Sequence, residues 1–247
     1  TLQIASNDAN ENPFDINLSG TGVALAGTVA MFANPTYVDV AGEGAFTQTS
    51  LQSLGYVVST FTGITDADWN AAFASASVVI IPDLEVGTPS LSAAAIAAIN
   101  SQLASGKGMV VMGANAANEQ TFLNSIRGWS LVDSGNIDSG TMAKLAGVIG
   151  FTNSPANLTA LNATYLVSTA SLPVGSQPVY QSASGTAVFV NGPVAYVGYD
   201  WFSGANASWT SVLGDAITAV GTPIVGPEIS VEQPAGSALA DGSSTVQ

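Results

Sequence analysis

Four short apolar runs in the first half of the chain alternate with stretches of helix-forming residues. The runs are TVAMF at 28–32, YVVST at 56–60, VVII at 78–81 and MVVM at 109–112, and AFTQTSLQSLG, DADWNAAFASAS and SLSAAAIAAINSQLASG lie between them. Gly55 and Gly106 are placed as C-terminal caps of the first and third stretches. Strand, helix and strand at this spacing require right-handed crossovers and a parallel sheet. The sequence therefore predicts an α/β domain over residues 23–222.

The second half of this domain carries a different signal. TAVFVNG and VAYVGYD are separated by about two residues around Gly192 and Pro193, which predicts an antiparallel hairpin. ANASWTSVLGDAITAV follows and is expected to form a closing helix. We therefore expect a mostly parallel sheet that ends in an antiparallel return.

Neither histidine nor cysteine occurs among the 247 residues. Serine and threonine nucleophiles normally need an adjacent base, most often histidine, and thiolate catalysis needs cysteine. Zinc, haem and iron–sulfur sites draw on the same two residue types. The composition therefore argues against these reactions and cofactors and predicts that the chain is not an enzyme of those classes.

The charge balance bears on possible partners. The chain has 17 acidic and 3 basic residues, a net charge of -14, so its field repels phosphate backbones and anionic membranes. No apolar run approaches the roughly 18 residues of a membrane-spanning helix. We expect neither nucleic-acid binding nor membrane insertion.

The two ends of the chain carry strand signals of their own. Leu2 and Ile4, then Ile16 and Leu18, alternate with polar residues on either side of the turn-rich NDANENP. This pattern predicts a hairpin over residues 1–22. At the other end, within 223–247, Ile229 and Val231 alternate with polar residues as an opening strand would. Two strands alone are marginal in water, so we expect neighbouring strands to cover these apolar faces.

These ends resemble a known repeat. IASNDANENPFDINLSGTG is similar to the closing hairpin of the immunoglobulin-like choice-of-anchor D repeats of large bacterial surface proteins, and PEISVEQPAGSALADG is similar to their opening strand. The resemblance implies an extracellular or cell-surface location. It also implies that the chain is excised from a longer string of β-sandwich repeats, with neighbouring repeats or copies of itself as partners.

The middle of the chain resembles the flavodoxin-like core of class I glutamine-amidotransferase-like domains. The resemblance is carried by VVIIPDLEVG, SGKGMVVMGAN and AYVGYDWF. In catalytic members a nucleophilic cysteine sits in a tight elbow after the strand that matches 109–112. Here the elbow reads Gly113, Ala114 and Asn115, and the family's later histidine has no counterpart. The resemblance thus implies the scaffold without the amidotransferase activity.

Oxygen-rich residues follow each predicted parallel strand, where ligands bind in open α/β sheets. They are Asp39, Glu43, the segment 62–66, Asp83, Glu85, Asn115, Asn118 and Glu119. Among them Asp39, Glu43, Asp83 and Glu85 are the candidate ligands for calcium, which accepts carboxylate oxygens, although no EF-hand loop occurs. A carboxylate pair could also hydrolyse a glycosidic bond. A chain with 17 carboxylates, however, places some of them at every such edge.

Aromatic residues gather near the C-terminal end of the domain: Tyr196, Tyr199, Trp201, Phe202 and Trp209. Exposed rings would suit sugar stacking or a protein interface. The alternation in VAYVGYDWF instead favours burial of at least half of them, and Asp200 is expected to cap or hydrogen-bond a neighbouring loop.

Three functions remain open at this point. The first is a non-enzymatic structural or assembly module of a secreted surface or fibre-forming protein. The second is a glycan- or calcium-binding module that uses the acidic and aromatic edge. The third is a carboxylate-dependent hydrolase.

Overall fold

The computed structural model describes residues 2–4, 14–16, 27–113, 117–161 and 164–221. Its helices are α1 (Glu43–Ser53), α2 (Asp66–Ser75), α3 (Ala93–Ala104), α4 (Asn118–Arg127) and α5 (Ala207–Val220), with a 3₁₀ turn at Thr169–Ser171. Its strands are β1 (Leu2–Ile4), β2 (Phe14–Ile16), β3 (Gly27–Phe32), β4 (Tyr56–Phe61), β5 (Val78–Ile81), β6 (Gly108–Met112), β7 (Asp133–Ile137), β8 (Thr141–Ala143), β9 (Asn157–Thr159), β10 (Thr164–Val167), β11 (Gln177–Ser182), β12 (Gly185–Asn191) and β13 (Val194–Val197).

The large sheet is parallel in its first half. Its strands lie in the order β4-β3-β5-β6-β13-β12-β10-β7, with β11 paired to β12. The pairs β3–β4, β3–β5, β5–β6 and β6–β13 are all parallel. Every residue of β5, β6 and β13 is buried, as expected for parallel strands covered on both faces. The predicted parallel strands and the helices between them are confirmed.

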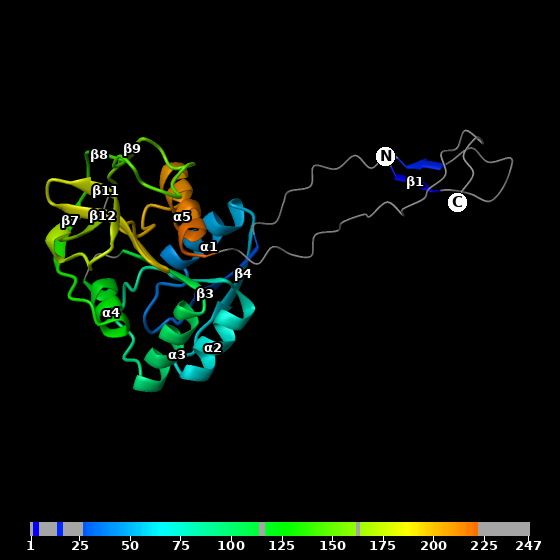
Figure 1. Cartoon of the computed structure of the whole chain (residues 1–247), viewed down its shortest axis with the longest axis horizontal. Coiled ribbons are helices and arrows are strands. Elements are labelled where there is room, and N and C mark those ends of the chain that lie inside the picture. Colours follow the sequence, from blue (N-terminus) through cyan, green and yellow to red (C-terminus); the bar gives the residue numbers. More distant parts are fainter. Residues whose placement is uncertain (1, 5–13, 17–26, 114–116, 162–163, 222–247) are drawn as a thin grey trace, which may run out of the picture.

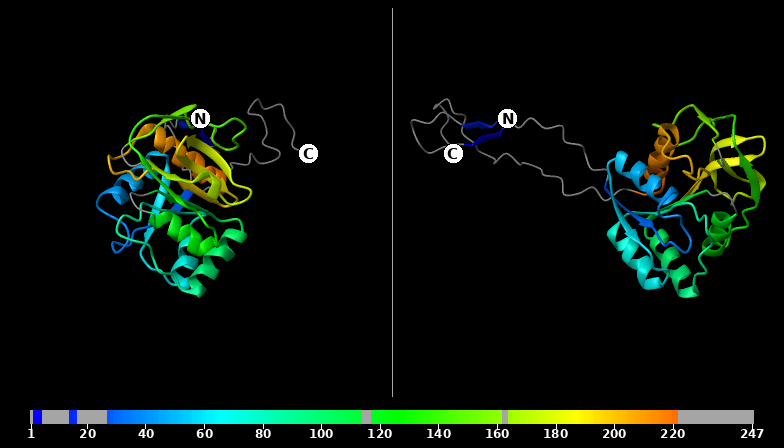
Figure 2. Two further views of the ribbon diagram at one scale, coloured as in Figure 1. Left: turned by 90° about the vertical axis from the view of Figure 1, so that its left-hand side faces the viewer. Right: turned by 180° about the vertical axis from the view of Figure 1, so that it is seen from behind.

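Helices cover both faces of the sheet (Figures 1 and 2). On one face α2, α3 and α4 pack over a core that includes Phe32, Trp69 and Phe122. On the other face α1 and α5 pack over a second core that includes Val110, Trp201 and Trp209. The middle of the chain is thus a three-layer α/β unit with a flavodoxin-like order of parallel strands.

The helix ends follow the local sequence. Thr65 and Asp68 form a reciprocal capping box at the start of α2, and Ser92 caps α3 by accepting the Ala95 N–H. After α1 and α3, Gly55 and Gly106 have φ angles of 87° and 96°, which glycine adopts without steric penalty. The two glycines predicted as C-terminal caps therefore occupy left-handed positions just beyond the helices.

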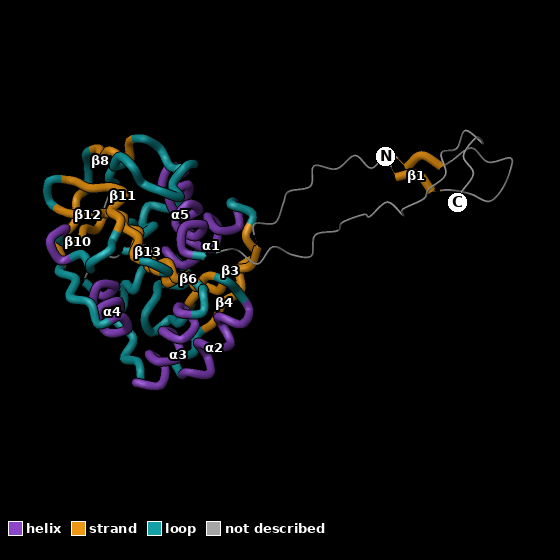
Figure 3. Tube along the Cα trace, viewed as in Figure 1, coloured by secondary structure: helices purple, strands orange, loops and turns teal. Residues whose placement is uncertain are grey.

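The antiparallel half of the sheet is larger than the sequence indicated (Figure 3). The predicted hairpin is present: β12 and β13 pair antiparallel from Asn191↔Val194 to Val188↔Val197. Beyond it, β10 pairs with β12 and β7, β11 pairs with β12, and β8 pairs with β9 in a separate two-stranded sheet. These strands have no strong apolar run of their own, so their assignment depends on pairing with distant segments.

At the N-terminal end, β1 and β2 pair antiparallel, with Leu2 opposite Ile16, Gln3 opposite Asp15 and Ile4 opposite Phe14. Two apolar pairs therefore flank one polar pair. The other residues of the predicted end strands, namely Leu18, Ile229 and Val231, lie outside the described residues.

Candidate functional site

Four buried carboxyl groups gather where the parallel strands end. Asp83 follows β5, Asp200 follows β13, and Glu43 and Glu119 lie in the first turns of α1 and α4. Their side chains are almost inaccessible to solvent, with exposed fractions of 5% for Glu43, 1% for Asp83, 0% for Glu119 and 4% for Asp200. Acidic residues are rarely buried to this extent without a charged partner. We refer to these four residues as the carboxyl cluster.

The start of α4 holds the turn after β5 in place. The Leu84 N–H donates to Glu119 Oε1 at 2.7 Å, and Asn118 Nδ2 donates to the Leu84 carbonyl at 2.8 Å. Thr88 Oγ1 adds a bond to the Asn118 carbonyl at 3.1 Å. These bonds place Asp83 and Glu119 side by side although 35 residues separate Leu84 from Glu119.

Asp83 is the most perturbed member of the carboxyl cluster. Neither of its oxygens has a hydrogen-bond partner in the described structure. Burial is the largest cause that raises the pKa of Asp83 to about 10, and repulsion from Glu119, Glu85, Asp200 and Glu43 contributes the rest. Asp83 therefore keeps its proton at neutral pH and is a neutral carboxylic acid.

Asp200 and Glu43 are perturbed in the same direction. Burial raises the pKa of Asp200 to about 6, against a bond in which the Phe202 N–H donates to Asp200 Oδ1 at 2.9 Å. Burial also raises the pKa of Glu43, with smaller contributions from Asp39 and Glu85. The loop contact expected of Asp200 is thus a local turn that ends two residues later.

Trp201 directly follows Asp200 and has a φ of 64°, the only positive φ among the described non-glycine residues. Its ring is fully buried, and its Nε1–H donates to Ser50 Oγ of α1 at 2.8 Å. Such left-handed conformations persist where the surroundings fix them, and they concentrate at functional sites. The sequence offered no signal for this conformation.

The four candidate calcium ligands do not share one environment. Glu43 and Asp83 are buried, whereas Asp39 and Glu85 are exposed. Asp39 Oδ1 accepts the N–H groups of Ala41 and Gly42 and shapes the turn before α1. Within the described ranges, no three acidic residues are spaced to hold a metal ion. Asn115, which was expected at the same edge, lies outside those ranges.

The aromatic part of the predicted edge has to be corrected. Tyr196, Tyr199, Trp201 and Trp209 are all buried, with exposed fractions of 0–1%, while Phe202 is 63% exposed. Tyr199 stacks on Trp209 at 5.0 Å between ring centroids. The predicted burial of most of these rings is confirmed, and they are core residues that cannot stack on a sugar.

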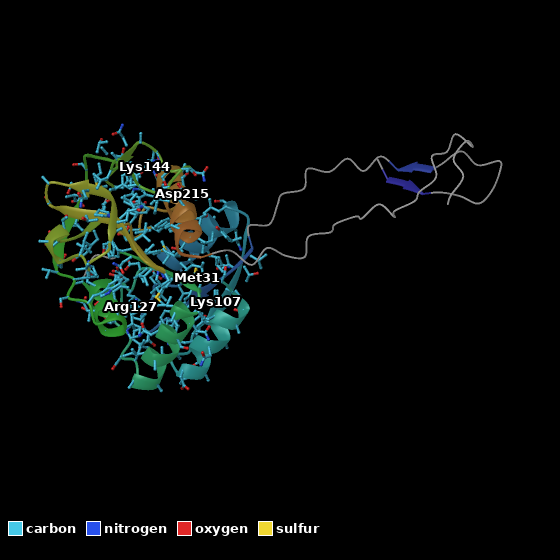
Figure 4. The ribbon with its side chains drawn as sticks, viewed as in Figure 1. Met31, Lys107, Arg127, Lys144 and Asp215 are labelled. Atoms are coloured by element: carbon cyan, nitrogen blue, oxygen red, sulfur yellow. The ribbon has the colours of Figure 1, made fainter. Side chains whose placement is uncertain are left out.

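The three basic residues make their described hydrogen bonds away from the carboxyl cluster. Lys107 Nζ donates to the Ala76 carbonyl, Arg127 Nη1 donates to Asn100 Oδ1, and Lys144 Nζ donates to the carbonyls of Phe151 and Ser154. Figure 4 shows Lys144 near Asp215, with Lys107 and Arg127 in the other half of the unit. Protonation of Asp83 therefore lowers the negative charge of the cluster without a cation.

The end of β6 is packed too tightly for a side chain. A Cβ on Gly113 would lie 2.7 Å from Tyr196 Oη and 2.8 Å from the Gly198 Cα, closer than real contacts of this kind. The backbone of β6 therefore approaches β13 closely at the point where the predicted elbow begins. Chemically, this edge can hold and exchange protons through carboxyl groups.

Comparisons with known proteins identify the fold. No protein-family model and no curated protein sequence matches the chain. Among solved structures, a putative ThuA-like protein from Bacteroides uniformis matches with a TM-score of 0.57 and 15% identity, over 82% of this chain and 94% of that one. A second ThuA-like protein, from Parabacteroides merdae, matches at 0.52 with 10% identity, over 81% and 92%.

A GMP synthase component from Thermoplasma acidophilum also matches at 0.52 with 10% identity, over 78% of this chain and 94% of that one. These matches support the class I glutamine-amidotransferase-like fold expected from the sequence. At such low identity they establish the fold alone. None of the described helices is long and apolar enough to cross a membrane.

Proposed function

We propose that this chain is a non-enzymatic assembly module of a secreted, repeat-containing surface or fibre-forming protein. The observation that carries the proposal is the strand pair β1–β2, in which Leu2↔Ile16 and Ile4↔Phe14 flank Gln3↔Asp15. In the described structure this pair is a two-stranded sheet of its own. Two strands with an alternating apolar pattern are marginally stable in water.

The energetics favour completion by further strands. Burying each aliphatic side chain of such a pair is worth roughly 1.5 to 3 kcal/mol, and open strand edges pair readily with other strands. The similarity of residues 4–22 and 227–242 to parts of choice-of-anchor D repeats supplies the partner: strands of a neighbouring repeat or of a neighbouring copy, joined edge to edge.

The α/β unit fits a scaffold role. The amidotransferase fold needs a cysteine at its elbow and a histidine to activate it, and the chain contains neither residue. We therefore propose that the unit acts as a spacer between β-sandwich repeats, in an extracellular or cell-surface setting. Its partners in this proposal are neighbouring repeats or copies of itself.

Deletion of residues 1–20 tests the assembly role. We expect the truncated chain to lose concentration-dependent assembly, measured by light scattering, while the α/β unit keeps its melting temperature. The matched pair of point variants is Ile4→Ser, which removes an apolar residue of the pattern, and Gln3→Ser, which does not. Assembly of the truncated chain at the level of the full chain would show that these strands are not the assembly element.

A second candidate function is a binding module at the carboxyl cluster. The observation that favours it is Asp83, which is 1% exposed and whose two oxygens lack a partner in the described structure. A buried acceptor without a donor is destabilising, and a ligand donor or a calcium ion would relieve this. A glycan would then be held by hydroxyl groups, because the neighbouring rings are buried.

Thermal melting with calcium and with a chelator separates the two functions. A ligand that binds only the folded state raises the melting temperature, and Asp83→Asn would abolish that rise. Equal midpoints at millimolar calcium would remove the metal site. The third function, a carboxylate-dependent hydrolase, requires that the same substitution abolish a measurable turnover of a glycoside.

A further inference from the structure

Strand β4 forms one edge of the large sheet, and its outer side has no strand partner in the described structure. It pairs with β3 in unbroken register from Gly27↔Tyr56 to Phe32↔Phe61. Its sequence, YVVSTF, contains no charged residue and no proline. Edge strands are normally protected by a charge, a proline or a bulge, and β4 has none of these. Its outer backbone groups are therefore suited to accept another strand.

A groove lies beside this edge, between β4 and α2. It has a volume of about 390 Å³, and α2 lines it with the small residues Ala71, Ala72 and Ser75. Val57 of β4 is 48% exposed. The small residues of α2 leave space next to the edge, which the side chains of an added strand can fill.

Charge argues for an uncharged partner strand. The chain carries a net charge of -14, and Lys107, Arg127 and Lys144 are all hydrogen-bonded within their own copy. Two copies therefore repel each other over most of their surfaces. The uncharged edge of β4 is a stretch where they can approach without placing acidic strand residues opposite each other.

We propose that β4 pairs antiparallel with β4 of a second copy across a two-fold axis, which joins the two sheets into one. This surface is distinct from the terminal strands of the proposed function. The antiparallel arrangement places Asp66 and Asp68, which follow the end of β4, at opposite ends of the contact. A parallel arrangement would bring the two acidic pairs together and is disfavoured.

Side-chain faces fix which registers are allowed. Ser59 and Phe61 face α2, because Ser59 Oγ lies 3.5 Å from Ser75 Oγ and Phe61 packs on Trp69. Tyr56 belongs to the core on the other face. Opposite residues must share a face, so a register centred on Ser59 pairs Val57 with Phe61 of the second copy. A β-branched residue opposite an aromatic ring is a favourable cross-strand pair.

The absence of cysteine gives a clean test of this register. In the variant Ser59→Cys, the two new thiols face each other across the axis, at a separation that a disulfide spans. We expect oxidation to give a covalent dimer at least about tenfold faster than for Val174→Cys, because the first pair of thiols is held together and the second is not. Val174 is fully exposed and lies outside β4. Equal rates for the two variants would overturn the proposal.

The variant Val57→Lys tests the surface without a disulfide. Two lysines added to the edge place charge at the contact, as natural edge strands do. We expect sedimentation equilibrium to show loss of the dimer, with an unchanged melting temperature of the monomer. A chain that is monomeric before the substitution contradicts the proposal, and so does a dimer that survives Val57→Lys but disappears on deletion of residues 1–20. Loss of the dimer on Val57→Lys with terminal assembly retained separates this surface from the proposed function.

Discussion

Substitution of Asp83 by asparagine should stabilise the fold at neutral pH. The carboxyl group is buried without a hydrogen-bond partner in the described structure, and burial with repulsion from Glu119 raises its pKa to about 10. In the unfolded chain the same group ionises near its ordinary value of 3.8. Asparagine has nearly the same shape and no proton to retain, so it removes the penalty of keeping the acid protonated.

The magnitude follows from linkage between proton binding and folding. The folded chain binds one more proton than the unfolded chain between pH 3.8 and about 10, so the free energy of unfolding falls as pH rises through this window. At pH 7 the fall spans about three pH units at roughly 1.4 kcal/mol each, which gives as much as ~4 kcal/mol. Below pH 3.8 both states hold the proton and the penalty vanishes.

Urea unfolding at a series of pH values from 4 to 9 measures this effect. We expect Asp83→Asn to flatten the decline in the free energy of unfolding, with a small difference from the parent at pH 4 and the largest gain at the alkaline end. Asp66→Asn is the matched control because Asp66 is exposed. It should change stability by less than about 0.5 kcal/mol throughout. Parallel pH profiles for the parent and Asp83→Asn would refute the inference that burial holds a proton on Asp83.

Three further predictions concern the elbow, the loop under α5 and activity. Gly113→Ala should destabilise the fold by roughly 1–3 kcal/mol in urea unfolding, because its Cβ would lie 2.7 Å from Tyr196 Oη; Gly106→Ala, where a Cβ meets open space, tests strain without a clash. Asp215→Ala should cost about 3 kcal/mol or more and expose residues 150–156 to proteolysis, since Asp215 accepts bonds from Asn153 and Ser154, and Thr218→Ala is the control. A glutaminase assay should give no turnover above buffer, and turnover that Gly113→Ala abolishes would contradict the scaffold proposal.

Much of the α/β unit could be predicted because its signals are local. The runs at 28–32, 56–60, 78–81 and 109–112 are apolar over the length of a buried strand, and each is followed by a turn or a helix start. Gly192, with a φ of 55°, marks the turn between β12 and β13. Apolar runs, caps and turns depend on neighbours within a few residues, so the chain itself displays them.

The antiparallel additions could not be predicted in the same way. Strand β7 reads DSGNI and is only half-buried, and it becomes a strand through its pairing with β10. Strands β8 and β9 are three residues each. Short polar strands have no distinct periodicity, so distant partners decide whether they form.

The sequence by itself determined the absences and the strand ends: no histidine, no cysteine, and acidic residues after each parallel strand. Only the tertiary structure decided which of those acids matter. Asp83 and Glu119 became a buried pair because β5 and β6 are neighbours and α4 closes over the turn between Asp83 and Thr88, while Asp39 and Glu85 stayed in solvent. Desolvation and charge repulsion depend on which segments the sheet brings together and on how much water remains between them, and neither quantity is a property of a residue and its neighbours in the chain.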